Sequence, residues 1–231
     1  MNSGLLARLR NSDFKLALFD LDGTLVDSVP DLADAVDYSM QQLDLPLPGQ
    51  GRVRLWVGNG TPMLVRRALA YGMDLPSTDA VPDALLEQAL EHFSQHYQQH
   101  HAARTELYTG ARELLEHWFN QGIQLALVTN KPARFTHPLC EALDIARFFA
   151  VMISGDTLSV RKPDPGQLVH ACEALGVTRR DTVMIGDSIH DLHAARAAAI
   201  SAVCVSYGYN HGENICEANP DLLVDSLSEL L

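Results

Sequence analysis

Two aspartates that are one residue apart, Asp20 and Asp22, directly follow the apolar run 15–19. Alternate side chains of an extended chain share a face, so both carboxylates can point to one place. Gly23 then permits a turn that a Cβ would resist. Carboxylates this close repel each other unless a cation lies between them or one holds a proton. Such a pair can bind Mg²⁺ beside a phosphate or supply a nucleophile, although an acidic turn after a strand is the simpler alternative.

Three further polar segments follow apolar runs later in the chain. Thr129 and Asn130 offer a hydroxyl and backbone N–H donors for phosphate oxygens, whereas each alone would be explained by a capped turn. Lys162 precedes a proline-opened helix, where a solvated lysine is the simpler interpretation. Asp187 and Asp191 lie four residues apart, and an N-cap explains only one of them. Because all four segments fall at predicted carboxyl ends of one sheet, we interpret them together as an active site.

Short apolar runs alternate with stretches of helical spacing and must position these residues. The expected strands are 15–19, 123–128, 151–153, 182–185 and 202–205, and the expected helices are 111–120, 136–143, 165–175 and 189–199. Runs without polar alternation are typical of strands buried on both faces. The alternation predicts an α/β fold with a doubly wound, Rossmann-like parallel sheet.

One long region, from Val29 to about Ala103, contains no convincing strand. Its apolar residues recur at helical intervals, as in Leu32, Val36 and Met40. We therefore predict an inserted helical cap at residues 28–103 and an α/β core formed by residues 1–27 and 104–231.

The charge balance limits the partners. Lys and Arg number 17 against 29 Asp and Glu, giving a formal net charge of −12. This excess repels nucleic acid and anionic membranes, and no apolar run reaches the roughly 18 residues of a membrane span. Residues 1–15 lack the apolar core of a signal peptide, and the cysteines form no paired motif. We expect a cytoplasmic protein.

The motifs together resemble those of the haloacid dehalogenase (HAD) superfamily. The matching strings are Asp-x-Asp-Gly-Thr at 20–24, Thr129, Lys162-Pro163, and Gly186-Asp187-Ser188-x-x-Asp191. The resemblance covers nearly the whole chain, and the helical insert is similar to the C1-type cap of that superfamily. Within it, the bacterial phosphoglycolate phosphatases are similar in the strings 56–60, 127–132 and 207–212.

The resemblance implies a phosphomonoester hydrolase that forms an aspartyl-phosphate. Asp20 is expected to be the nucleophile, and Asp22 the general acid and base. Mg²⁺ is expected on Asp20, the backbone carbonyl of Asp22 and Asp187, with Asp191 as a further ligand or an anchor behind them. The transferring phosphate is expected to contact Thr24, Thr129, Asn130 and Lys162.

The resemblance also implies 2-phosphoglycolate as the substrate, whose carboxylate needs an anion site in the cap. Gly58, Asn59 and Gly60 precede a helical run whose first N–H groups could receive it. Nearby arginines could pair with it, or they are solvated beside a glycine-rich turn; they are Arg52, Arg54, Arg66 and Arg67.

Two other features depart from the simplest pattern. His92, His96 and His100 share one face of a predicted helix and could hold zinc or nickel, although a solvated helix is the simpler interpretation. Ala199 stands near the end of a helix where we expect glycine.

Several functions fit these motifs. The first is hydrolysis of 2-phosphoglycolate, and a close alternative is a phosphatase of a sugar phosphate, a nucleotide or pyrophosphate. A β-phosphoglucomutase-like phosphomutase would share the core motifs, and a catalytically silent binding protein is a third class. In each case we expect a small phosphorylated metabolite as partner, and a monomer or homodimer.

Overall fold

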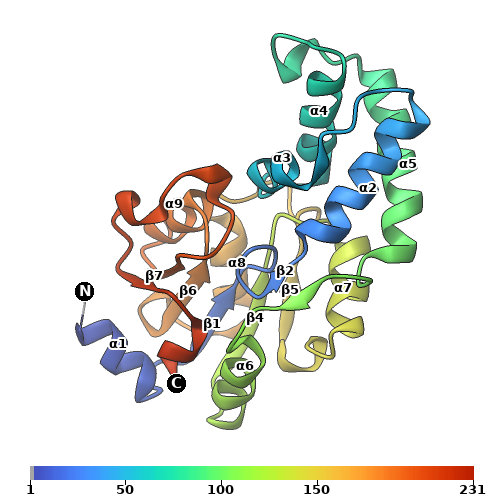
Figure 1. Ribbon diagram of the computed structural model, residues 1–231. Coiled ribbons are helices and arrows are strands. Elements are labelled where there is room, and N and C mark those ends of the chain that lie inside the picture. Colours follow the sequence, from blue (N-terminus) through green and yellow to red (C-terminus); the bar gives the residue numbers. More distant parts are fainter. Residues whose placement is uncertain (1–2) are drawn as a thin grey trace.

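The computed structural model describes residues 3–231, so residues 1 and 2 of the predicted core lie outside the described part. A parallel sheet has the strand order β5-β4-β1-β6-β7-β8 (Figure 1). The strands are β1 (Leu16–Phe19), β4 (Gln124–Val128), β5 (Val151–Ile153), β6 (Thr182–Gly186), β7 (Ser201–Val205) and β8 (Leu222–Val224). The predicted doubly wound α/β fold is confirmed.

Helices cover both faces of the sheet. Ala17 and Phe19 of β1 pack on one face, and Leu16 and Leu18 pack on the other. The first face carries α1 (Ser3–Arg10), α6 (Ala111–Asn120) and α7 (Ala133–Ala142), and the second carries α8 (Gly166–Leu175) and α9 (Ile189–Ala197). Burial on both faces explains why β1 is apolar throughout, without polar alternation.

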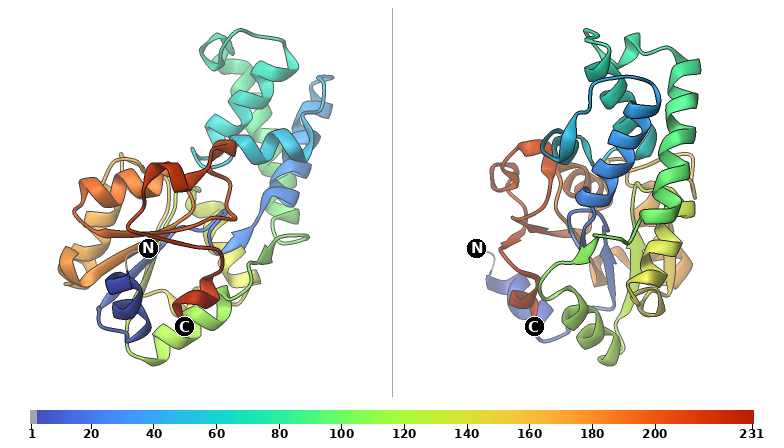
Figure 2. Two further views of the ribbon diagram at one scale, coloured as in Figure 1. Left: turned by 60° about the vertical axis from the view of Figure 1, so that its left-hand side comes forward. Right: turned by 45° about the vertical axis from the view of Figure 1, so that its right-hand side comes forward.

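A second group of helices has a hydrophobic core of its own, which includes Met40, Leu69 and Phe93. It consists of α2 (Val29–Gln42), α3 (Gly49–Trp56), α4 (Thr61–Gly72) and α5 (Asp83–His100). Figures 1 and 2 show this bundle set apart from the sheet and its covering helices. Phe135 from α7 and Tyr209 join the core of the bundle, so the two parts pack against each other.

The chain leaves the sheet for the bundle and returns from it at one place. There β2 (Val26–Asp27) and β3 (Glu106–Leu107) form an antiparallel pair. The buried carboxylate of Asp31 accepts hydrogen bonds from the backbone N–H groups of Arg104 and Thr105, at 2.9–3.1 Å. This carboxylate therefore ties the outgoing segment to the returning one.

Some elements differ from the sequence prediction. Helix α7 begins at Ala133, earlier than predicted, with Pro132 as its N-cap, so Thr129 caps no helix. Strand β8 and helix α1 were not predicted, because each is short and follows no motif. Short 3₁₀ helices occupy Thr78–Ala80, Ala146–Phe148, Arg179–Asp181, Asn210–Gly212, Ile215–Ala218 and Leu227–Leu230. Every helix within residues 3–231 is too short or too polar to cross a bilayer.

The backbone conformation at the end of α9 explains why glycine was expected at position 199. Ala199 adopts a left-handed conformation with φ of 55°. Its N–H donates to the carbonyl of Arg196, and the N–H of Ile200 donates to Ala195, the two bonds of a Schellman motif. An L-residue is strained in this conformation, whereas glycine is not.

Ala199→Gly is expected to stabilise the protein by about 0.5–1 kcal/mol, because relief of this strain exceeds the entropy that glycine adds to the unfolded chain. Urea unfolding monitored by circular dichroism measures the change. Ala197→Gly is the matched control, since Ala197 is also exposed but lies within the helix, and it is expected to destabilise by about 0.5–1 kcal/mol. Destabilisation by both substitutions would contradict the assignment of strain to Ala199.

Candidate active site

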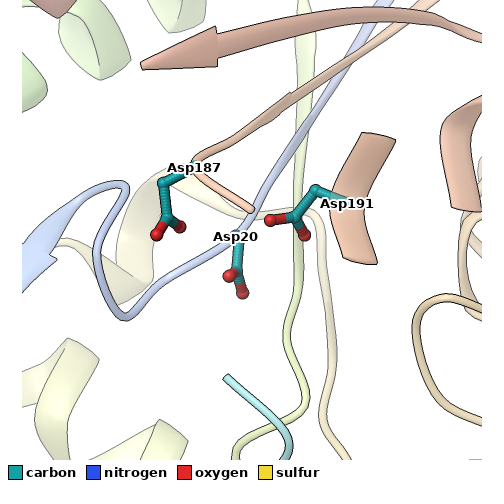
Figure 3. A group of neighbouring side chains, drawn as sticks. All are labelled: Asp20, Asp187 and Asp191. Carbon is teal, nitrogen blue, oxygen red and sulfur yellow. The ribbon is translucent and has the colours of Figure 1, made fainter. Parts of the chain in front are cut away.

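Three carboxylates meet at the carboxyl ends of β1 and β6. Asp20 follows β1, Asp187 follows β6, and Asp191 lies in the first turn of α9. Figure 3 shows the three side chains converging from these elements. Each offers an oxygen, and these oxygens lie within 4.8 Å of one another. Because β1 and β6 are adjacent strands, with Phe19 opposite Ile185, their ends bring distant segments of sequence to one point.

Lys162 supplies the positive charge within this cluster. Its Nζ lies 2.9 Å from Asp20 Oδ1 and 2.6 Å from Asp191 Oδ1. Only 2% of its side chain is exposed, so the solvated lysine considered for this position is wrong. Burial by itself lowers the pKa of Lys162, but Asp191 and Asp20 raise it above the ordinary value. The ammonium group is therefore held in its charged form.

The three carboxylates share one ammonium group, so burial and mutual repulsion raise the pKa values of two of them. Burial raises the pKa of Asp187 to about 8, with further contributions from Asp191 and Asp20. Burial likewise raises the pKa of Asp20 to about 6, although Lys162 opposes this. Asp20 Oδ1 is buried, and its contact with the Lys162 ammonium group at 2.9 Å lacks the geometry of a hydrogen bond. A hard divalent cation fits such a set of oxygens.

Neighbouring groups hold two of these carboxylates in place. Thr24 is fully buried, and its hydroxyl donates to Asp187 Oδ1 at 2.8 Å. The N–H and hydroxyl of Ser188 donate to Asp191 Oδ2, and the N–H of Asp191 donates back to the Ser188 hydroxyl oxygen, which completes a capping box at the start of α9. The N-cap of α9 is therefore Ser188, and helix capping leaves Asp187 unexplained.

Asp22 lies on a turn that packs against Asp187. Gly23 has φ of 91°, and its N–H donates to the carbonyl of Val26 at 2.9 Å. A Cβ at Gly23 would lie 2.4 Å from Asp187 Oδ2, so this close approach requires glycine. The carboxylate of Asp22 accepts hydrogen bonds from the Ser28 hydroxyl at 2.5 Å and from Lys131 Nζ at 3.0 Å.

A pocket lies between these residues and the helical bundle. Its walls combine the strand ends with the bundle: they are Asp20, Asp22, Leu32, Val57, Gly58, Gly60, Thr61, Leu64, Thr129, Asn130 and Lys131. The amide of Asn130 donates to the carbonyls of Gly58 and Lys162, each at 3.0 Å. Asn130 thereby connects the glycine-rich loop of the bundle to the loop that carries Lys162.

Asn59, which was expected at the substrate, makes a different contact. Its Nδ2 lies 2.8 Å from Nε2 of His190, and that atom lies 3.1 Å from Nε2 of His211. Asn59 does not belong to the pocket lining of the described chain. Its contacts join the loop of the bundle to the start of α9.

The four arginines considered for a carboxylate do not belong to this lining either. Arg54 pairs with Asp27 at 3.1 Å, and Arg66 pairs with Asp83 at 2.8 Å. Arg52 lies over the ring of Tyr71, and Arg67 donates to the carbonyl of Trp56. Each of these guanidinium groups is engaged elsewhere.

The histidine face of α5 does not form a metal cluster within the described residues. The rings of His96 and His100 stack with their centroids 4.4 Å apart, and His100 Nδ1 lies 2.9 Å from the carbonyl oxygen of His96. His92 and His96 are half-buried, and His100 is exposed. These observations agree with the simpler interpretation of a partly solvated helix.

Two residues of the site were missed by the sequence analysis. Lys131 is 4% exposed, and its Nζ lies 4.9 Å from the ring centroid of Tyr97 as well as against Asp22. Tyr209 has its hydroxyl against the N–H of Ser28 at 2.9 Å, and its own N–H donates to Asp187 Oδ2 at 2.8 Å. Both lie in strings that resemble the phosphoglycolate phosphatases, 127–132 and 207–212, but the sequence analysis gave neither side chain a role.

Comparisons with known proteins concern the family of this chain and its fold. A family model of the haloacid dehalogenase-like hydrolases matches residues 14–199. The phosphoglycolate phosphatase of Pseudomonas syringae pv. syringae is 48% identical over 217 residues, which cover 94% of this chain and 78% of that protein. The phosphoglycolate phosphatase of Nitrosococcus oceani is 46% identical over 217 residues, which cover 94% of each chain. The crystal structure of a predicted phosphoglycolate phosphatase from Haemophilus somnus has a TM-score of 0.89 and 32% identity, covering 94% of this chain and 96% of that one.

The raised pKa of Asp187 predicts a pH dependence of stability in the metal-free protein. The folded state keeps this proton up to about pH 8, whereas the unfolded chain loses it near about pH 4. The free energy of unfolding therefore falls as the pH rises between these values. Asp187→Asn cannot ionise, so its stability relative to the wild type is expected to increase by about 3 kcal/mol between about pH 5 and about pH 8.

Urea unfolding in the presence of a chelator measures this difference. Added Mg²⁺ is expected to stabilise the wild type more than the variant at the higher pH, because the ion binds ionised carboxylates of the folded state. Parallel pH profiles for the two proteins would contradict the assignment to Asp187.

Proposed function

Because the chain belongs to the haloacid dehalogenase-like hydrolases, we propose that it is a Mg²⁺-dependent phosphatase that converts 2-phosphoglycolate to glycolate and phosphate. The observation that carries the proposal is the buried pairing of Asp20 with Lys162 at 2.9 Å, on the wall of a pocket enclosed by the bundle. The names of relatives at 46–48% identity support the choice of substrate.

The reaction uses two carboxylates in different roles. The Asp20 carboxylate attacks phosphorus, and the bond from phosphorus to the alkoxide oxygen breaks. Asp22 protonates the leaving alkoxide and then removes a proton from the water that hydrolyses the aspartyl-phosphate. This second step releases phosphate and restores both side chains.

The remaining groups place the phosphate and balance its charge. Lys162, held against Asp20 and Asp191, stabilises negative charge on the transferring group together with the hydroxyl of Thr129 and the backbone N–H of Asn130. Thr24 contributes indirectly, because its hydroxyl fixes Asp187.

Asp20, the backbone carbonyl of Asp22 and Asp187 would hold Mg²⁺, with Asp191 as a further ligand or an anchor. The close set of buried oxygens supports this assignment. A bound Mg²⁺ would neutralise charge on the carboxylates and on the phosphate oxygens.

The bundle gives this site its second wall. We propose that residues 28–103 act as a cap domain on a core formed by 1–27 and 104–231. Leu32, Val57 and Leu64 are cap side chains that line the pocket, so closure of the cap would exclude water from the reacting atoms.

Phosphate release from 2-phosphoglycolate in the presence of Mg²⁺ tests this proposal directly. Asp20→Asn is expected to lower kcat by about 1000-fold or more, because it removes the nucleophile. One phosphate is expected to be released for each glycolate formed. A screen with a sugar phosphate, a nucleotide and pyrophosphate is expected to show the fastest turnover with 2-phosphoglycolate. Isomerised product without free phosphate would indicate a phosphomutase, and faster turnover of another metabolite would overturn the choice of substrate.

A further inference from the structure

Among the residues that line the pocket in the described chain, Lys131 is the one with a cationic side chain. The proposed reaction gives this side chain no role. Lys162, the cation that the proposed function assigns to the transferring phosphate, contacts Asp20 at 2.9 Å and does not belong to this lining. The lining also includes Asp20 and Asp22, and its cap side is largely apolar. A substrate with a second anionic group would therefore find one positive side chain on these walls.

The position of Lys131 relative to Asp22 defines where such a group would lie. Lys131 Nζ lies 3.0 Å and 3.1 Å from the two carboxylate oxygens of Asp22. Under the proposed function, Asp22 contacts the leaving alkoxide oxygen of the substrate. In 2-phosphoglycolate the carboxylate carbon is two bonds from that oxygen, so the carboxylate would lie next to Asp22. An ammonium group that contacts Asp22 can therefore also reach the substrate carboxylate.

The surroundings of Lys131 hold it in this position. Its side chain is 3% exposed, and its Nζ lies 4.9 Å from the ring centroid of Tyr97, a buried residue of α5. Its backbone N–H donates to the hydroxyl of Thr129 at 3.2 Å. The ammonium group is thus fixed between the cap and the strand ends, and little rearrangement is needed to bind an anion there.

We propose that Lys131 is a specificity-determining residue that binds the carboxylate of the substrate. This inference rests on the proposed function and extends it to one residue. On substrate binding, the ammonium group exchanges one contact with Asp22 for a contact with the substrate carboxylate. The arginines of the cap take no part, because each is engaged outside the pocket.

The test compares two substrates that differ in the carboxylate alone. Ethyl phosphate replaces the carboxylate of 2-phosphoglycolate by a methyl group, and both substrates require the same nucleophile and general acid. Lys131→Met is expected to lower kcat/KM for 2-phosphoglycolate about 100-fold and for ethyl phosphate less than about fivefold. Any disturbance of Asp22 affects both substrates. The ratio of their kcat/KM values therefore reports on recognition of the carboxylate alone.

Matched variants complete the experiment. Lys131→Gln is expected to give the same loss of preference and serves if the methionine variant fails to fold. Arg66→Met removes a cation of the cap that pairs with Asp83, and it is expected to leave the ratio unchanged. Equal losses on both substrates, or an unchanged ratio in the Lys131 variants, would overturn the inference.

Two further observations separate this inference from the proposed function. If the wild type does not prefer 2-phosphoglycolate to ethyl phosphate, the proposed substrate fails before any variant is compared. A crystal structure of Asp20→Asn with 2-phosphoglycolate keeps Lys131 intact. A substrate carboxylate within hydrogen-bond distance of Lys131 Nζ supports the inference, and a carboxylate bound elsewhere overturns it.

Discussion

Repulsion among three buried carboxylates is the constraint on which the rest of the site depends. Asp20, Asp187 and Asp191 present oxygens within 4.8 Å of one another, and burial strengthens the repulsion between charges there. Lys162 offsets part of this charge, while Thr24 and Ser188 fix the orientation of single carboxylates. The sheet keeps the cluster together, because the segments carrying Asp20 and Asp187 leave adjacent strands.

The bundle completes the wall of a site whose carboxylates belong to the ends of the strands. It supplies apolar walls and the glycine-rich loop, and the amide of Asn130 connects that loop to the segment carrying Lys162. Contacts of this kind exist only where the two parts of the molecule meet. The carboxylates and lysines of the site therefore come from segments that follow strands of the sheet, whereas the bundle contributes mainly apolar side chains and backbone.

The sequence predicted the sheet and its polar strand ends well, because both are local patterns. Apolar runs marked the central strands, and Asp20, Thr129 and Asp187 each follow one directly. The burial of Lys131 could not be predicted in this way, since it depends on Tyr97 of a helix that is distant in sequence. For the same reason the sequence left the role of the arginines open, because their partners are set by the packing of the bundle.

Tyr209 connects two events that are usually considered separately. Its hydroxyl contacts the N–H of Ser28, where the chain enters the bundle, and its N–H donates to Asp187. One residue thus holds both the attachment of the bundle and a member of the carboxylate cluster. By thermodynamic reciprocity, a ligand that tightens one end of this connection favours the ordered state of the other. Under the proposed function, the affinity for the ion and the position of the cap would therefore be linked.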